Sequence, residues 1–222
     1  MTKSRTAQLI FQTVYCAFGV LGSIACLGIF DDYKNMSWTF YVYFTNLSNF
    51  LCLGIMLAEL VQTARKKENS FVTVLPALKF VAMLGILLTF FVFNIMLAGN
   101  RDIQMNLQIK SILFHVVLPL MYVADWVMFY EHKKAKWFYP LLSTVFPIVY
   151  LLFVYSRAAI LGFDSENYFL YPYFFLDLDK QGVGGVAVWF GILAAAFVVV
   201  GYILFGIDRL IGNKKSRGTS EK

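Results

Sequence analysis

Six long runs of apolar residues, separated by polar segments, dominate the pattern of this 222-residue chain. A helix rises about 1.5 Å per residue, so about 20 apolar residues cross a hydrocarbon core of roughly 30 Å. Every run reaches that length, and the connections are short except the last. The pattern therefore predicts an all-α fold, a single domain over residues 1–222, built as a polytopic membrane bundle of six transmembrane helices. The predicted spans are residues 9–30, 38–61, 73–98, 108–130, 137–157 and 183–207.

Composition agrees with a membrane protein. Hydrophobic residues make up 59% of the chain and charged residues 14%, a balance that ordinary soluble domains do not have. The first run is longer than the core of a signal peptide and lacks a small-residue cleavage site. It is therefore expected to remain as a spanning helix.

Basic residues gather on one side of the predicted bundle and acidic residues on the other. Under the positive-inside rule, both termini are predicted to be cytoplasmic, in a multi-pass protein of the plasma membrane. The net charge of +6 follows from this topology and gives no support to a nucleic-acid partner. The acidic set is Asp31, Asp32, Asp102, Asp164, Glu166, Asp177 and Asp179, and the basic set is Lys3, Arg5, Arg65, Lys66, Lys67, Lys133, Lys134, Lys136, Arg209, Lys214, Lys215 and Arg217.

The sequence predicts no cofactor and no metal. Cys16, Cys26 and Cys52 all fall within predicted spans, where they are expected to act as small buried apolar residues. Two distant histidines and three scattered cysteines do not supply the clustered ligands that a metal site needs.

Candidate chemistry comes from polar residues inside the spans, which are costly in a bilayer and persist where they face a partner or water. Spans two and four are predicted to run in the same direction. Thr45 and His115 each lie seven positions into their span, which places both about 10 Å below the outer helix ends. A histidine can both accept and donate a proton near neutral pH, as a threonine nucleophile requires.

Each of the two residues also has a purely structural interpretation. Thr45, Ser48, Asn49 and Cys52 form one stripe that is expected to face the bundle interior, where such side chains commonly join helices by hydrogen bonds. Pro119 cannot donate a backbone bond to the His115 carbonyl, so a kink beside the imidazole is expected.

Other ionisable residues are expected to serve structure. Asp125 and Lys79 share a depth near the inner side and are predicted to form an ion pair. Glu59 is expected to reach water at the inner rim, and His132 is expected to be solvated in a cytoplasmic turn.

Further candidates lie near the outer side. Asn94 could donate to an oxyanion, or simply join two helices. The aromatic segment 168–177 fits an interfacial belt or a lid over a lipid site, and Asp177 is a candidate acidic partner for His115 if that lid folds inward.

Taken together, these segments resemble the androgen-induced integral-membrane hydrolase family, whose members cleave fatty acid esters of hydroxy fatty acids with a membrane-embedded threonine and histidine. Thr45 lies in a Tyr-Phe-Thr-Asn segment and His115 in a His-Val-Val-Leu-Pro segment, both similar to the family's sites. Tyr171-Pro172, followed by Asp177, is similar to a third segment. The chain departs from the animal enzymes in Asn46, Ser48 and Asn49 and in the spacing from Tyr-Pro to the acid.

The resemblance implies an intramembrane lipid-ester hydrolase in which His115 activates Thr45, with membrane lipids and a lipid ester as partners. Asn49 and Asn94 are candidate oxyanion donors, and Ser48 is a supporting candidate. Two other classes remain: a small-solute transporter or channel that uses the polar stripe as its path, and a non-catalytic membrane scaffold.

Overall fold

Six helices in the computed structural model are long and apolar enough to cross a membrane, as the sequence predicts. The structure describes residues 4–28, 39–68, 70–100, 107–162 and 169–220, and this part of the chain is helical with no strand. The six spans are Arg5–Cys26, Phe44–Arg65, Pro76–Leu97, Ile109–Phe129, Tyr139–Ile160 and Leu178–Gly212.

Several spans combine more than one helical element. The third and fourth spans each contain a stretch of π-helix, called η3 and η5, whose wider turns shift the side chains that follow. In chain order the elements are α1 (Arg5–Cys26), η2 (Phe40–Val42), α2 (Phe44–Arg65), α3 (Pro76–Phe91), η3 (Val92–Leu97), η4 (Ala98–Asn100), α5 (Ile109–Ile112), η5 (Leu113–Val117), α6 (Leu118–Phe129), α7 (Tyr139–Leu142), α8 (Val145–Ile160), η6 (Phe174–Leu176) and α9 (Leu178–Ser220).

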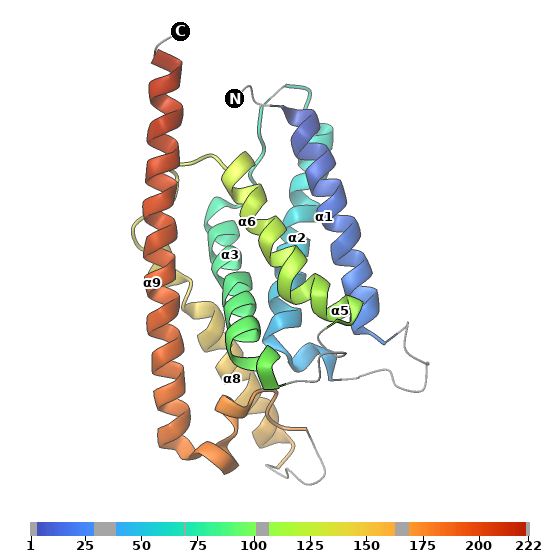
Figure 1. Cartoon of the computed structure of the whole chain (residues 1–222), viewed down its shortest axis with the longest axis vertical. Coiled ribbons are helices and arrows are strands. Elements are labelled where there is room, and N and C mark those ends of the chain that lie inside the picture. Colours follow the sequence, from blue (N-terminus) through green and yellow to red (C-terminus); the bar gives the residue numbers. More distant parts are fainter. Residues whose placement is uncertain (1–3, 29–38, 69, 101–106, 163–168, 221–222) are drawn as a thin grey trace.

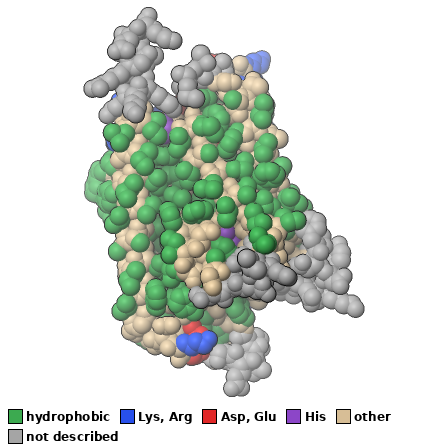
Figure 2. Space-filling model, viewed as in Figure 1, with side chains coloured by type: hydrophobic (Ala, Val, Ile, Leu, Met, Phe, Trp, Pro, Cys, Tyr) green, Lys and Arg blue, Asp and Glu red, His purple; other side chains and the backbone are tan. Residues whose placement is uncertain are grey.

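The centre of the bundle is formed by α1, α2, α3 and α6, which pack against one another (Figure 1). Large side chains such as Trp126, Tyr15 and Phe80 are fully buried between these helices. Apolar side chains also cover the flank of the molecule, as a bilayer requires (Figure 2). The long helix α9 contacts α3 and α7 along one side of this centre.

One close approach fixes the position of the fourth span. A β-carbon added at Gly22 of α1 would lie 2.4 Å from the ring of Phe114. Glycine therefore lets α1 and η5 come close together, which holds the segment that carries His115 against the bundle.

The start of α1 and the end of α9 lie at the same end of the bundle, which we call the termini end (Figure 1). Arg5 bonds there to the carbonyls of Thr63 and Ala64 at the end of α2. This arrangement agrees with a one-sided distribution of Lys and Arg, and the cytoplasmic orientation of that end remains a prediction. Five of the acidic residues on which the topology was based, Asp31, Asp32, Asp102, Asp164 and Glu166, lie outside the described residues.

The second span begins later than the pattern predicts. Residues 40–42 form a 3-10 turn and Tyr43 is extended, so α2 starts at Phe44 instead of residue 38. The Asn46 side chain donates to the Phe40 carbonyl at 2.7 Å and holds this turn. The aromatic residues before Phe44 extend the apolar run in the sequence without extending the helix.

The last span starts at Leu178, five residues before the predicted start, but it is kinked just before residue 183. Gly182 has φ 64° and ψ 169°, which breaks the helical path just before Val183. Only glycine adopts this conformation without strain. The predicted spans are otherwise displaced by a few residues; the first, for example, starts at Arg5 instead of residue 9.

Charged residues near the termini end follow the prediction in part. Lys79 pairs with Asp125 as expected. Glu59, expected to reach water, is fully buried and pairs with the same lysine. His132, expected to be solvated, has a side chain only 1% exposed and pairs with Asp208 of α9 at 2.9 Å. Both errors arise because depth along one helix does not say which neighbouring helix covers a residue.

Candidate functional site

Thr45 lies in the first turn of α2, at the end of the bundle opposite the termini. The first N–H groups of a helix have no partner within it. The N–H groups of Asn46 and Leu47 reach the Tyr43 carbonyl, whereas the one partner of the Thr45 N–H among the described residues is the hydroxyl of Tyr173, at a long 3.4 Å. The threonine is nine-tenths buried, with its hydroxyl beside the positive end of the helix dipole.

His115 lies in the π-helix η5, and its ring is fixed from two sides. The ring stacks on Phe93 of η3, with 3.5 Å between ring centroids and an interplanar angle of 12°. Its Nδ1 lies 2.9 Å from the carbonyl oxygen of Ser111 and 3.3 Å from the Ser111 hydroxyl. A carbonyl can only accept a hydrogen bond, so Nδ1 carries the proton and Nε2 carries the lone pair in the neutral ring. This tautomer is the one that a general base needs.

Pro119 has no N–H to donate to the His115 carbonyl, and a side chain takes its place. The His115 carbonyl accepts a hydrogen bond from Asn94 Nδ2 at 3.2 Å, across the contact between the third and fourth spans. Asn94 also donates to the Phe90 carbonyl at 2.8 Å. Asn94 therefore joins two helices, which was one of its two predicted roles.

Thr45 and His115 line one cavity of about 470 Å³. The wall of this polar cavity also contains Lys110 and Ser111, and Tyr173 covers it from the segment before α9. A second, more apolar cavity of about 240 Å³ lies next to it. Four residues belong to the walls of both cavities: Thr45, Phe93, Leu97 and Tyr173.

The two side chains are not in direct contact. Among the residues that the structure describes, the Thr45 hydroxyl has one side-chain partner, the Tyr173 hydroxyl at 3.5 Å. Among the described residues no hydrogen bond joins the two side chains, but both line one cavity, as expected for residues at similar depths. Thr45 lies in the first turn of its helix, and His115 lies in the second turn after Ile109. The cavity, and not a hydrogen bond, brings the pair together.

Below Thr45 the polar stripe of α2 joins helices. Ser48, Asn49 and Cys52 are buried, as predicted. The Ser48 hydroxyl lies 2.9 Å from that of Thr89, and Asn49 Nδ2 donates to the carbonyls of Thr45 and Phe114. Because these groups are used inside the bundle, the stripe does not supply the continuous polar path that a transporter needs.

The other predicted site residues lie apart from the pair. Within the described part of the chain, neither Ser48, Asn49 nor Asn94 lines either cavity. Asp177 caps the first turn of α9: its Oδ1 accepts the N–H groups of Asp179 and Lys180, and its Oδ2 pairs with Lys180 Nζ at 3.2 Å. Asp177 thus interacts within its own helix end.

Tyr173 is the main residue that the sequence did not single out. It lies within the aromatic segment that was predicted to form a belt or a lid, and its hydroxyl meets both the N–H and the hydroxyl of Thr45. Burial raises the pKa of Tyr173 above its usual value of about 10, so the phenol remains a hydrogen-bond donor at neutral pH. Nothing in the sequence distinguishes Tyr173 from the neighbouring aromatic residues.

The fold and cavities define a multi-pass helical membrane protein with a threonine and a histidine on the wall of one cavity. No family model, curated protein or solved structure matches this chain. The resemblance to the androgen-induced hydrolases therefore remains a prediction.

Proposed function

We propose that the protein is an intramembrane lipid-ester hydrolase, with Thr45 as nucleophile and His115 as general base. The observation that carries this proposal is the shared cavity, in which a buried threonine faces a histidine whose Nδ1 is held by the Ser111 carbonyl. Catalytic side chains that lie apart in an empty site can act through one water or after a small closure. A cavity of about 470 Å³ has room for such a water beside a substrate.

The chemistry follows from these positions. The Thr45 hydroxyl attacks the ester carbonyl while its proton passes to His115 Nε2, and His115 then protonates the departing alcohol. Water next attacks the acyl-threonine and gives its proton to the same nitrogen. The acid is released, and the proton returns to Thr45. Ser111 keeps the ring in the required tautomer throughout.

Two donors can stabilise the oxyanion. The Thr45 N–H is held only by the long contact to Tyr173, and a nucleophile's own N–H is a common oxyanion donor. The Tyr173 hydroxyl is the second donor, since it already lies near the Thr45 hydroxyl. We therefore propose the Thr45 N–H and the Tyr173 hydroxyl as oxyanion donors in place of Asn49 and Asn94. The side chains of those two asparagines donate to backbone carbonyls.

The paired cavities favour a substrate with one long apolar arm. The smaller cavity is almost wholly apolar and suits an acyl chain, whereas the polar cavity contains Lys110 and suits an alcohol part that carries a carboxylate. The ester bond would lie at Thr45, where the two cavities meet. Fatty acid esters of hydroxy fatty acids have this form, so we propose them, or related lipids, as substrates.

A covalent probe tests the nucleophile. We expect a fluorophosphonate, which traps activated hydroxyls, to label the purified protein in detergent, with the modification on the peptide that contains Thr45. Prior incubation with a lipid ester of a hydroxy fatty acid should slow the labelling. The proposal fails if the folded protein neither takes the probe nor hydrolyses any ester in a panel of acyl-chain and headgroup variants.

Removing the phenol of Tyr173 is expected to slow hydrolysis. Tyr173→Phe keeps the ring but deletes an oxyanion donor, and the loss of one such donor typically lowers the rate by about 10²–10³-fold. Tyr155→Phe is the matched control, because Tyr155 donates to the Leu176 carbonyl and lines neither described cavity wall. Steady-state kinetics measure both variants. Equal rates for the two would remove Tyr173 from the mechanism.

A further inference from the structure

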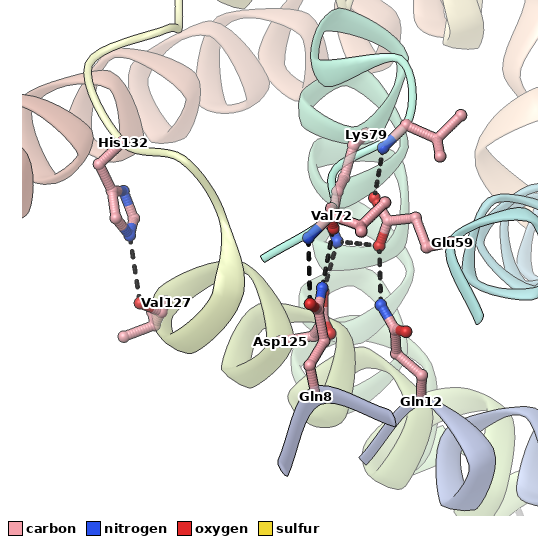
Figure 3. A network of polar contacts seen from close by, with 9 residues as sticks. Gln8, Gln12, Glu59, Val72, Lys79, Asp125, Val127 and His132 are labelled. Atoms are coloured by element: carbon pink, nitrogen blue, oxygen red, sulfur yellow. Dashed lines mark hydrogen bonds and ion pairs between the residues drawn. The ribbon is translucent and has the colours of Figure 1, made fainter. Parts of the chain in front are cut away.

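Three ionisable side chains from three helices meet near the termini end, away from both cavities. Lys79 of α3 donates to Glu59 Oε2 of α2 at 2.5 Å and to Asp125 Oδ2 of α6. All three side chains are fully buried. Figure 3 shows the lysine nitrogen close to both carboxyl groups. One cation therefore serves two acids, and the mechanism proposed above uses none of them.

The surroundings do not supply a second positive charge. Within the described residues, Lys79 is the one cation that acts on both acids. The other titratable side chains facing this cluster are weak acids, whose ionisation would add negative charge. They are Tyr15, Cys16, Cys52, Tyr122 and Tyr130. With both carboxyls ionised, the cluster would carry one net negative charge in the interior of a membrane bundle.

Two buried acceptor atoms in the described part of the cluster lack a donor. Gln12 of α1 points into the cluster and donates from Nε2 to Glu59 Oε2 at 3.3 Å. Among the described residues, its own Oε1 has no donor, and neither does Asp125 Oδ1. Both atoms belong to fully buried residues. One added O–H group would remove the shortage at one of these acceptors.

We infer that Glu59, Lys79 and Asp125 form a proton-binding site, which holds one proton on its two carboxyl groups at neutral pH. A buried net charge costs several kcal/mol, and a group in that position binds a proton to become neutral. With one proton bound, one carboxylate faces one ammonium and the cluster is neutral. The proton comes from bulk water, and no other species is needed.

A pair of hydrogen bonds joins α1 to the chain segment that borders the site. A water-facing cavity of about 450 Å³ near the termini end has Val72 in its wall. Val72 exchanges two hydrogen bonds with Gln8, at 2.8 and 3.1 Å, and the Val74 N–H donates to Glu59 Oε1 at 3.2 Å (Figure 3). Glu59 is thus the acid joined to the segment that lines this cavity, and the cluster itself remains enclosed.

Infrared spectroscopy of the full-length protein tests the inference. In a detergent that lacks carbonyl groups, at neutral pH, we expect one carboxylic-acid C=O band per chain, with a shift in heavy water. Glu59→Gln and Asp125→Asn should each abolish the band, because each leaves one acid to pair with Lys79. This response distinguishes a proton bound by the cluster as a whole from a carboxyl group protonated independently of its neighbours, for which only one of the two substitutions would act.

Substitution of Lys79 gives an independent test of the same inference. Lys79→Met leaves two acids with no cation, so the band should double in intensity. The inference is overturned if the wild-type protein has no such band, or if the band survives either carboxamide substitution. Because the two carboxamide variants keep a neutral cluster, they are expected to fold even if Lys79→Met does not.

Discussion

Thr45→Ala is expected to lower the rate of lipid-ester hydrolysis by about 10³-fold or more, to the level that binding alone supports. The substitution removes the proposed nucleophile and leaves the cavity otherwise intact. Thr13→Ala is the matched control: the Thr13 hydroxyl donates to a carbonyl of its own helix, that of Leu9, and Thr13 lines neither described cavity. That variant should remain within a few-fold of the wild-type rate.

His115→Ala should cost nearly as much, and the double variant should lose little more, because a nucleophile and its base act as a unit. The other histidine of the chain supplies the control. His132 pairs with Asp208 near the termini end, so His132→Gln should retain hydrolysis. Rates and probe labelling measure all five variants. Wild-type activity in stably folded Thr45→Ala and His115→Ala proteins would contradict the proposed roles of Thr45 and His115. The transporter and scaffold alternatives would then be favoured.

Lys79→Met is expected to destabilise the protein by about 3–5 kcal/mol at neutral pH, the usual cost of removing one partner of a buried ion pair, because both buried carboxyl groups must then bind a proton on folding. Lys134→Met is the matched control, since Lys134 pairs with Glu131 at an exposed site and should change the free energy of unfolding by less than about 1 kcal/mol. Chemical unfolding in detergent compares the two variants.

The deficit of Lys79→Met should shrink in acid. Folding of this variant must bind both carboxyl protons, one more than folding of the wild-type protein, so its relative stability falls by about 1.4 kcal/mol for each unit that the pH rises. This dependence applies in the pH range where carboxyls of the unfolded chain have lost their protons. A Lys79→Met protein as stable as wild type at neutral pH would contradict the proposal that Lys79 compensates the charge of two buried acids.

The sequence determined the number of spans, because each must present about 20 apolar residues to the bilayer. It also placed Lys79 and Asp125 at one depth, and the structure confirms their pair. The sequence did not reveal where a helix is interrupted within an apolar run. Aromatic residues suit both a helix and an interfacial turn, so the extended Tyr43 and the late start of α2 could not be read from the pattern.

For the candidate site, too, some features could be predicted from the sequence and others only from the structure. Thr45 and His115 could be chosen from the sequence because polar side chains in a span are costly without a partner. The contacts of these two residues could not be predicted from the sequence. Tyr173 reaches Thr45 across 128 residues of chain, and Glu59 reaches Lys79 from another helix. Helical periodicity gives the face and depth of a side chain on its own helix, whereas the rotation and packing of neighbouring helices decide what that face meets. The sequence by itself determined the class of fold and the polar residues within it. Only the tertiary structure decided that Thr45 and His115 line one cavity without direct contact and that two acids share one lysine.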